Sequence, residues 1–317
     1  MKHNFAARKV AQARSDLRWL HLIHSATTPG ILHTQDAFLD IIRTPFPNSF
    51  VIFPNAYDIP RVARNMGYEE FQVKCVPHAT DICDFFDMHP MSRRIIDTSN
   101  MLQADVIGCY PLRLDRGKQP HYVIRTFAAL KALKLVVRLV IVDFHSTGGD
   151  KVTYRKEMLL EMQQRGLSPQ EIIFTSQFDK SLVCTSPRSL VRDFMMISNV
   201  FILPSRSETY SLVAQEAGLC KNLLVLNQDF PPMRSIYGEM PLYRQFSSNI
   251  NANTGLDGNT ETNYDNEMLY WKDLASAIWG HISHDKALHM ATKLRMERNP
   301  YTIFKKHLEP LFYMEIR

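Results

Sequence analysis

The pattern of hydrophobic positions becomes regular from about residue 105 onward. Short apolar runs there alternate with longer segments in which apolar residues recur at helical spacing. The apolar runs predict strands at 106–110, 137–142, 172–175, 201–203 and 223–226. The segments between them predict helices at 119–135, 154–165, 189–197 and 212–219. Strands that alternate with helices indicate βαβ units and therefore a doubly wound α/β domain with a parallel sheet.

The regions on either side of this alternation are less regular. The first hundred residues predict strands at 19–24 and 51–53 and a helix at 59–66. The segment 247–266 is polar and rich in Asn, Gly and Thr, so we expect an irregular loop. Helices are predicted at 267–284 and 285–298, and Pro300 precedes a final short element. These patterns predict three parts. They are a small N-terminal domain over 1–80, a complete α/β domain over 81–298, and a tail over 299–317 that packs back on the N-terminal domain.

Composition and charge restrict the class of protein only broadly. A chain of 317 residues has room for two domains, at roughly 100–200 residues each. Its 45% hydrophobic and 22% charged residues are ordinary for a globular protein. The net charge of +5 favours partners that carry phosphate, but it does not choose among a nucleotide, a nucleic acid and an anionic membrane.

The cysteines and the apolar runs indicate where in the cell the protein is expected. No two of the five cysteines form a Cys-x-x-Cys pair, which predicts buried free thiols in a reduced, cytoplasmic setting. The N-terminus lacks the apolar core of a signal peptide, and no apolar run reaches the roughly 20 residues of a membrane span. We therefore expect a cytoplasmic protein without a transmembrane segment. A basic N-terminal segment leaves peripheral membrane contact open (Arg8, Lys9, Arg14 and Arg18).

The strongest chemical motif is LPSRSETYSLVAQEAG, residues 203–218. A predicted strand ends at Leu203, a polar turn follows, and a helix begins near Ser211. The turn places Glu208 at the carboxyl edge of the sheet, where α/β proteins bind their ligands. The free amides of residues 210–212 and the helix dipole suit a phosphate group. Glu216 lies farther along the same helix, within reach of the same cleft.

This motif resembles the Glu-x7-Glu signature of glycosyltransferase family 4, which contains retaining enzymes of the GT-B fold. The matching positions are Pro204, Ser205, Glu208, Tyr210, Leu212, Val213, Glu216 and Ala217. Ser211 replaces the usual Gly of the pattern, and Lys221 and Asn222 stand where the family often has Gly-Pro. The resemblance implies an α/β, GT-B-like fold with a complete C-terminal Rossmann-type nucleotide-binding domain and a reduced N-terminal α/β domain.

A second match is Arg113-Leu-Asp-Arg-Gly-Lys118, which has the family's Arg-x4-Lys spacing after the first strand of the nucleotide domain. Two cations there would stabilise the charge that grows on a departing diphosphate. The chain contains no Asp-x-Asp, which fits the metal-independent class, so neither a metal nor another cofactor is expected. The family's glycine-rich turn after the next strand is missing, and Asp143-Phe144-His145 stands in its place.

Two matches lie in the N-terminal part. Residues 76–81, VPHATD, are similar to the hinge between the family's domains. Residues 22–27, LIHSAT, resemble the strand whose His contacts the transferred sugar, which here is His24. The family normally has many more residues before that His. The acceptor-side domain is therefore reduced, or a partner chain or homo-oligomer completes it.

The resemblance also implies a role for each site residue. Glu216 would bind the ribose hydroxyls, Glu208 the sugar hydroxyls, and His24 would lie beside the reacting sugar. Arg113 and Lys118 would hold the diphosphate, and the base would lie against Thr175, Ser176 and Phe178. The remaining donor-binding positions are Thr209, Tyr210, Ser211 and Leu212. Family members of this kind use the donor's own phosphate as the base, so no carboxylate nucleophile is expected.

Three hypotheses on function remain open from the sequence. The first is a retaining glycosyltransferase that moves a hexose or pentose from a nucleotide sugar, such as a UDP- or GDP-sugar, to a glycan or lipid-linked glycan. The second is a viral-type DNA glycosyltransferase, because a small basic enzyme suits a modified base in a polyanionic acceptor. The third is a non-catalytic nucleotide-sugar-binding subunit that needs a partner chain.

The spacing of His281, His284 and His289 does not put all three on one helical face, so a metal site is not expected there.

Overall fold

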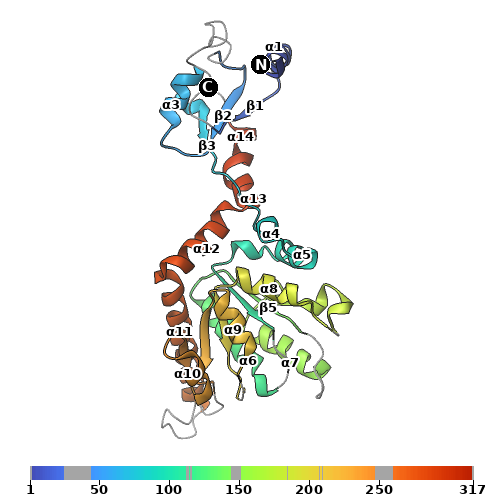
Figure 1. The fold of residues 1–317 in the computed structure, drawn as a ribbon, viewed down its shortest axis with the longest axis vertical. Coiled ribbons are helices and arrows are strands. Elements are labelled where there is room, and N and C mark those ends of the chain that lie inside the picture. The colour runs from blue at the N-terminus through green and yellow to red at the C-terminus, as the bar shows by residue number, and fades with distance from the viewer. Residues whose placement is uncertain are drawn as a thin grey trace. The chain divides into compact units, whose positions relative to one another are not determined.

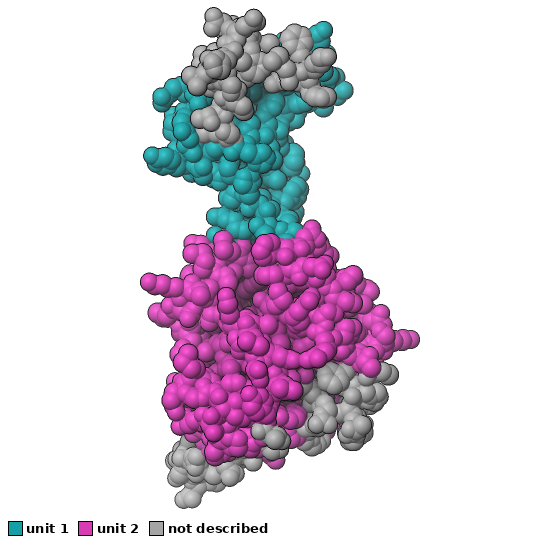
Figure 2. All heavy atoms as spheres, viewed as in Figure 1, with its two compact units in different colours: residues 1–81, 297–317 teal, residues 82–296 magenta. Residues whose placement is uncertain are grey.

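The computed structural model describes residues 2–24, 44–111, 114, 116–143, 151–183, 185–206, 208, 210–246 and 260–315. Contacts divide the chain into two compact units, coloured separately in Figure 2. Unit 1 comprises Met1–Asp81 and Glu297–Arg317, and unit 2 comprises Ile82–Met296. The C-terminal residues therefore belong to the same unit as the N-terminal ones.

Unit 1 is built on a sheet of three parallel strands in the order β1-β2-β3 (Figure 1). The strands are β1 (Trp19–Leu22), β2 (Ser49–Phe53) and β3 (Val73–Cys75). The other elements of the unit are α1 (Lys2–Ala13), α3 (Ile59–Met66), η2 (Glu70–Gln72), α13 (Pro300–Ile303), η8 (Phe304–Leu308) and α14 (Glu309–Tyr313). β2 is central, and all five of its residues are buried.

Alternation along β2 explains why the C-terminal segment belongs to unit 1. Val51 and Phe53 pack with Val62 of α3. Ile52, between them in sequence, belongs to a second cluster with Ile303 and Leu311. Successive side chains of a strand point to opposite faces, so α3 covers one face of the sheet and the C-terminal helices cover the other.

Unit 2 is a doubly wound α/β domain around a six-stranded parallel sheet in the order β6-β5-β4-β7-β8-β9. Its strands are β4 (Val106–Tyr110), β5 (Val137–Ile141), β6 (Ile172–Phe174), β7 (Val200–Leu203), β8 (Leu223–Asn227) and β9 (Leu242–Arg244). The chain runs outward from β4 to β6 and then returns to place β7 on the other side of β4. The strand order therefore reverses between β4 and β7, which makes this the topological switch point of the sheet.

The helices of unit 2 connect these strands or follow them (Figure 1). They are α4 (Ile82–Phe85), α5 (Pro90–Thr98), α6 (Pro120–Ala132), α7 (Lys151–Gln164), α8 (Arg188–Ile197), α9 (Leu212–Leu219), α10 (Pro231–Tyr237), α11 (Thr260–His284) and α12 (Lys286–Arg298). Short 3-10 turns occur at η3 (Met101–Gln103), η4 (Arg116–Lys118), η5 (Thr175–Gln177) and η6 (Lys180–Val183). None of the described helices combines the length and the apolar character needed to cross a bilayer.

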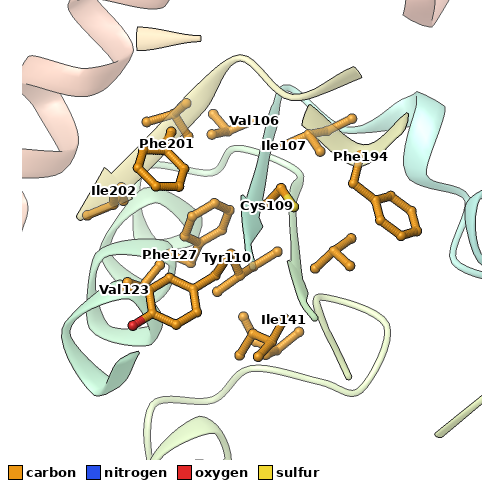
Figure 3. Close-up of a cluster of buried hydrophobic side chains, with 14 of the residues drawn as sticks. Val106, Ile107, Cys109, Tyr110, Val123, Phe127, Ile141, Phe194, Phe201 and Ile202 are labelled. Carbon is orange, nitrogen blue, oxygen red and sulfur yellow. The ribbon is translucent and has the colours of Figure 1, made fainter. Parts of the chain in front are cut away.

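The core of unit 2 lies between β4 and its flanking helices (Figure 3). Tyr110 on β4 and Phe127 on α6 are almost completely buried in one cluster. Gly108 permits a close approach of α6 to the strand, because a Cβ built there would lie 2.6 Å from Cζ of Phe127. The tight packing holds the start of α6 against the carboxyl end of β4, where the turn that contains Lys118 begins.

The predicted GT-B-like, α/β fold with parallel sheets is confirmed. The predicted strands from residue 106 onward match the observed ones to within one residue at each end. One prediction was wrong: residues 260–266 are the first turns of α11 and not loop, although residues 247–259 lie outside the described part of the chain. Their Asn and Thr content favours a loop, but they continue a long helix that packs along α6, and local propensity is a weak guide beside tertiary structure. The sequence patterns also missed β3 and β9, which are three residues each and too short to show a period.

Two carboxylates and two guanidinium groups join α6, α7 and α11. Glu161 on α7 accepts from Nε of Arg125 at 2.7 Å and from Nε of Arg165 at 3.1 Å. Glu267 on α11 accepts from the same two arginines, at 2.8 and 3.1 Å. Burial would raise the pKa of Glu161, but the hydrogen bonds and charges of Arg125 and Arg165 outweigh it and hold the pKa below its ordinary value.

This network predicts a pH-dependent contribution to stability. Because the folded pKa of Glu161 is lowered, its contribution is complete above the unfolded pKa, about 4.3, and is lost as pH falls through the folded value. The cost of Glu161→Gln, measured by urea denaturation, should therefore be largest at neutral pH and shrink below about pH 4. Glu239→Gln, which alters a solvent-exposed pair with Arg234, should change little at either pH. An equal cost of Glu161→Gln at every pH would contradict the assignment.

Candidate functional site

An ion pair joins the two loops at the topological switch point. Lys118 lies in the turn after β4, and Glu208 lies in the loop after β7. The Lys118 ammonium donates to Oε1 of Glu208 at 2.5 Å, and the two side chains are only 16% and 13% exposed. Ligands of doubly wound sheets bind in the crevice outside the carboxyl ends of the strands at this point. The structure thus brings together two of the predicted catalytic residues where a ligand is expected.

Backbone contacts hold the two loops together. The amide of Arg206 donates to the carbonyl of Gly117 at 3.0 Å, which ties the loop after β7 to the turn after β4. The hydroxyl of Tyr110 donates to the carbonyl of Lys118 at 2.8 Å. Tyr110 is itself buried at the end of β4. The position of the Lys118 backbone is therefore set by the core of the sheet.

Each loop leads into its helix through a non-glycine residue in the left-handed conformation. Gln119 has φ +52° before α6, and Ser211 has φ +60° before α9. Side chains other than Gly rarely adopt this conformation, and such residues concentrate at functional sites. The hydroxyl of Tyr237 donates to the carbonyl of Ser211 at 2.9 Å, which helps to hold the second of them. Glycine adopts this conformation without strain, so the backbone at Ser211 would also accept Gly.

The second glutamate of the motif is in a different environment. Glu216 lies within α9, and its Oε1 accepts from Arg188 of α8 at 3.1 Å. The Glu216 side chain is 41% exposed and that of Arg188 is 94% exposed. Solvent screens this pair far more than the pair of Lys118 and Glu208. Glu216 is consequently free to exchange partners at small cost.

A buried carboxylate organises the neighbouring strand ends. Asp143, just after β5, accepts from the amide of Ser176 at 2.9 Å, from the Ser176 hydroxyl at 2.5 Å and from the Thr175 hydroxyl at 3.3 Å. Nε of Arg155 on α7 lies 3.2 Å from the same carboxylate. Asp143 therefore fixes the turn after β6, where the predicted base-binding residues lie. Both hydroxyls of that turn are engaged with it.

The other predicted donor-binding side chains border this edge. Phe178 is partly buried against the core. Tyr210 and Leu212, at the start of α9, are exposed.

Burial raises the pKa of Tyr237, and the nearby Tyr210 and Glu208 raise it further. A phenol that stays protonated can serve as a hydrogen-bond donor beside the motif.

Three predicted site residues remain, of which the structure describes only His24. His24 belongs to unit 1, where its Nδ1 lies 3.5 Å from Nε2 of His78, and the two rings stack with centroids 5.0 Å apart. His24 follows β1 and His78 follows β3, so the pair lies at the carboxyl edge of the small sheet. Arg113 and Thr209 lie outside the described residues.

Sequence reasoning missed three side chains that shape the site. Tyr110 and Tyr237 bond to the backbones of Lys118 and Ser211, and Arg188 pairs with Glu216. Tyr110 could have been suspected, because it is a polar side chain at the end of a strand that precedes the motif. Tyr237 and Arg188 carry no local signal, since their partners are far away in the sequence. Asp143 stood out in the sequence, but its role in the turn after β6 did not.

One family model matches the part of the chain that contains both loops. Residues 101–239 match the sequence model of the family described as "Glycosyl transferases group 1". The match includes Lys118, Glu208 and Glu216 and both loops of the switch point. No curated protein sequence matches the chain significantly.

Several solved structures are similar to the chain at low identity. HepE of Anabaena in complex with UDP is 16% identical, with a TM-score of 0.39, over 96% of this chain and 81% of that one. The UDP-forming alpha,alpha-trehalose-phosphate synthase of Burkholderia xenovorans is 13% identical, with a TM-score of 0.44, over 98% and 76%. Sucrose-phosphate synthase of Thermosynechococcus elongatus is 18% identical, with a TM-score of 0.40, over 95% and 69%.

Proposed function

We propose that the group 1 glycosyltransferase domain formed by residues 101–239 belongs to a retaining, metal-independent enzyme of family 4 that uses a nucleoside-diphosphate sugar. The predicted glycosyltransferase activity is confirmed at the level of the group. The finer assignment depends mainly on one observation: Lys118 and Glu208 meet at the switch point of the sheet, 2.5 Å apart. One supplies a cation for a diphosphate, and the other supplies an acceptor for sugar hydroxyls.

In this proposal each part of such a donor has a binding group. Lys118, together with Arg113 as the resemblance implies, holds the diphosphate beside the amides at the start of α9. Glu208 accepts hydrogen bonds from the sugar, and Glu216 exchanges its exposed partner Arg188 for the ribose hydroxyls. The turn that Asp143 holds, with Ser176 and Phe178, lies against the base. Both hydroxyls of that turn and the Ser176 amide bond to Asp143, which holds the turn in place for the base.

The chemistry proceeds by departure of the nucleoside diphosphate. The bond between the anomeric carbon and the phosphate oxygen breaks, and a bond to the acceptor oxygen forms on the same face of the sugar. The acceptor's proton passes to the departing phosphate oxygen, so no side chain has to act as nucleophile or base. Lys118 stabilises the negative charge that accumulates on the diphosphate as the bond breaks. The role of His24 beside the reacting sugar stays a prediction from the resemblance.

A panel of donors tests the proposal. Thermal unfolding of the purified chain should be measured with UDP-glucose, GDP-mannose and ADP-glucose, followed by release of the nucleoside diphosphate from each. One donor should stabilise the protein, by about 2.7 kcal/mol at 100 times its dissociation constant. The same donor should be hydrolysed slowly without an acceptor, and EDTA should not abolish this turnover. Absence of both stabilisation and turnover, with every donor, would contradict the proposal.

A further inference from the structure

The ion pair between Lys118 and Glu208 is built into the fold. Its two side chains are largely shielded from solvent, at 16% and 13% exposure, so the attraction between them is screened less than that of a surface pair. Each residue extends from a loop that is tied to the other loop by the bond from Arg206 to Gly117. The two charged groups therefore face each other without a large entropic cost of ordering two free side chains.

The pair conflicts with the two roles that the proposed function gives its members. While Lys118 binds Glu208, the carboxylate offsets its charge and uses one of its donors, which weakens its attraction for a diphosphate. While Glu208 binds Lys118, a carboxylate lies where phosphate oxygens would lie, and like charges repel. A ligand that takes Lys118 must therefore leave Glu208 in a shielded position, beside phosphate oxygens and without its cation. That state is costly unless the ligand also supplies hydrogen-bond donors to the carboxylate.

We propose that the pair of Lys118 and Glu208 is a latch that discriminates the nucleotide-sugar donor from the nucleoside-diphosphate product. The inference rests on the proposed function. A nucleotide sugar opens the latch, because its diphosphate takes Lys118 and its sugar hydroxyls donate to Glu208. A nucleoside diphosphate supplies only the first of these contacts. After transfer, Glu208 loses its hydroxyl donors and competes again for Lys118, which weakens product binding and favours release.

The second glutamate offers a matched control. Glu216 is also a carboxylate of the motif with a basic partner, but its pair with Arg188 is exposed to solvent. In the proposed function it binds the ribose, which donor and product share. Loss of its charge should therefore affect both ligands by the same factor. Loss of the charge of Glu208 should strengthen binding of the diphosphate but not binding of the donor.

Calorimetric titrations test the latch with three product and donor pairs: UDP with UDP-glucose, GDP with GDP-mannose, and ADP with ADP-glucose. The wild type, Glu208→Gln and Glu216→Gln are compared at one ionic strength. For the pair that the wild type binds, Glu208→Gln should bind the diphosphate about tenfold more tightly, within the 5–150-fold range of typical couplings between binding events. It should bind the nucleotide sugar no more tightly than the wild type does. Glu216→Gln should leave the ratio of the two dissociation constants unchanged.

The outcomes separate the latch from the function on which it rests. If the wild type binds a donor but Glu208→Gln binds the diphosphate no more tightly, the latch is wrong and the proposed function stands. If the wild type binds none of the ligands, both fail. Glu208→Ala is a second variant, which should also bind the diphosphate more tightly than the wild type does. Thermal unfolding of each variant tests whether the fold is retained. Equal changes in the dissociation constants of donor and product, in both Glu208 variants, would also overturn the latch.

Discussion

Replacement of Lys118 by alanine should lower kcat of sugar transfer by about 10²–10³-fold, as does the loss of one group that stabilises developing charge in other enzymes. The ammonium lies at the switch point, on a backbone that Tyr110 holds in place. Because the charge on the diphosphate grows as the glycosidic bond breaks, the loss should appear mainly in kcat and less in KM for the donor. Steady-state rates with the donor found in the panel measure both.

A second lysine of the same domain supplies the control. Lys131, in the last turn of α6, pairs with Glu171 at 2.8 Å, so Lys131→Ala also removes a lysine that is paired with a glutamate. It lies at the opposite end of α6 from Lys118, away from the carboxyl edge of the sheet. Lys131→Ala should therefore retain transfer. Wild-type activity in Lys118→Ala, or equal losses in the two variants, would show that the site is misplaced.

Replacement of Arg295 by methionine should lower the free energy of unfolding by about 3 kcal/mol, because it removes a charged donor from three backbone carbonyls. Arg295 on α12 is almost completely buried and donates to the carbonyls of Met101, Leu102 and Ala104. Burial lowers its pKa to about 10, and the charge of Asp105 opposes that shift only partly. The charged group is thus costly to bury, and its value to stability lies in the carbonyls that it satisfies.

Urea denaturation measures this loss directly, and a neighbour on the same helix controls for it. Lys293 is exposed on α12, so Lys293→Met removes a positive charge from that helix without removing a buried donor. It should change stability by less than about 0.5 kcal/mol. A stability of Arg295→Met equal to that of the wild type would mean that the three carbonyls find other partners.

The sheet of unit 2 could be predicted in detail because its strands are buried on both faces. Runs such as Val137–Ile141 are almost continuously apolar, and each is followed by a segment with helical periodicity. Elements without such a signal could not be predicted. β9 is three residues long, and β3 of unit 1 is equally short, so pairing with a neighbouring strand and not local pattern decides that they are strands. The first turns of α11 contradict their own composition for a similar reason.

The residues of the candidate site also fall into those that the sequence could predict and those that it could not. The motif around Glu208 and Glu216 was evident from the sequence, because a strand, a polar turn and a helix leave a local pattern of residues. The order of the strands in the sheet leaves no such local pattern in the sequence. Lys118 and Glu208 are 90 positions apart and meet only because β4 and β7 are neighbours in the sheet. The contact of Asp143 with Ser176 likewise depends on the pairing of β5 with β6.

The sequence by itself thus determined the strands and most of the helices of unit 2 and the kinds of side chain at the carboxyl edge of its sheet. Periodicity, turn residues and motif spacing are local properties, and a single chain displays them. Only the tertiary structure decided which of those side chains face each other: Lys118 is paired with Glu208, while Glu216 is left to solvent and Arg188. The physical reason is that strand order and burial arise from contacts between distant segments, and these contacts set the electrostatic state of each charged group.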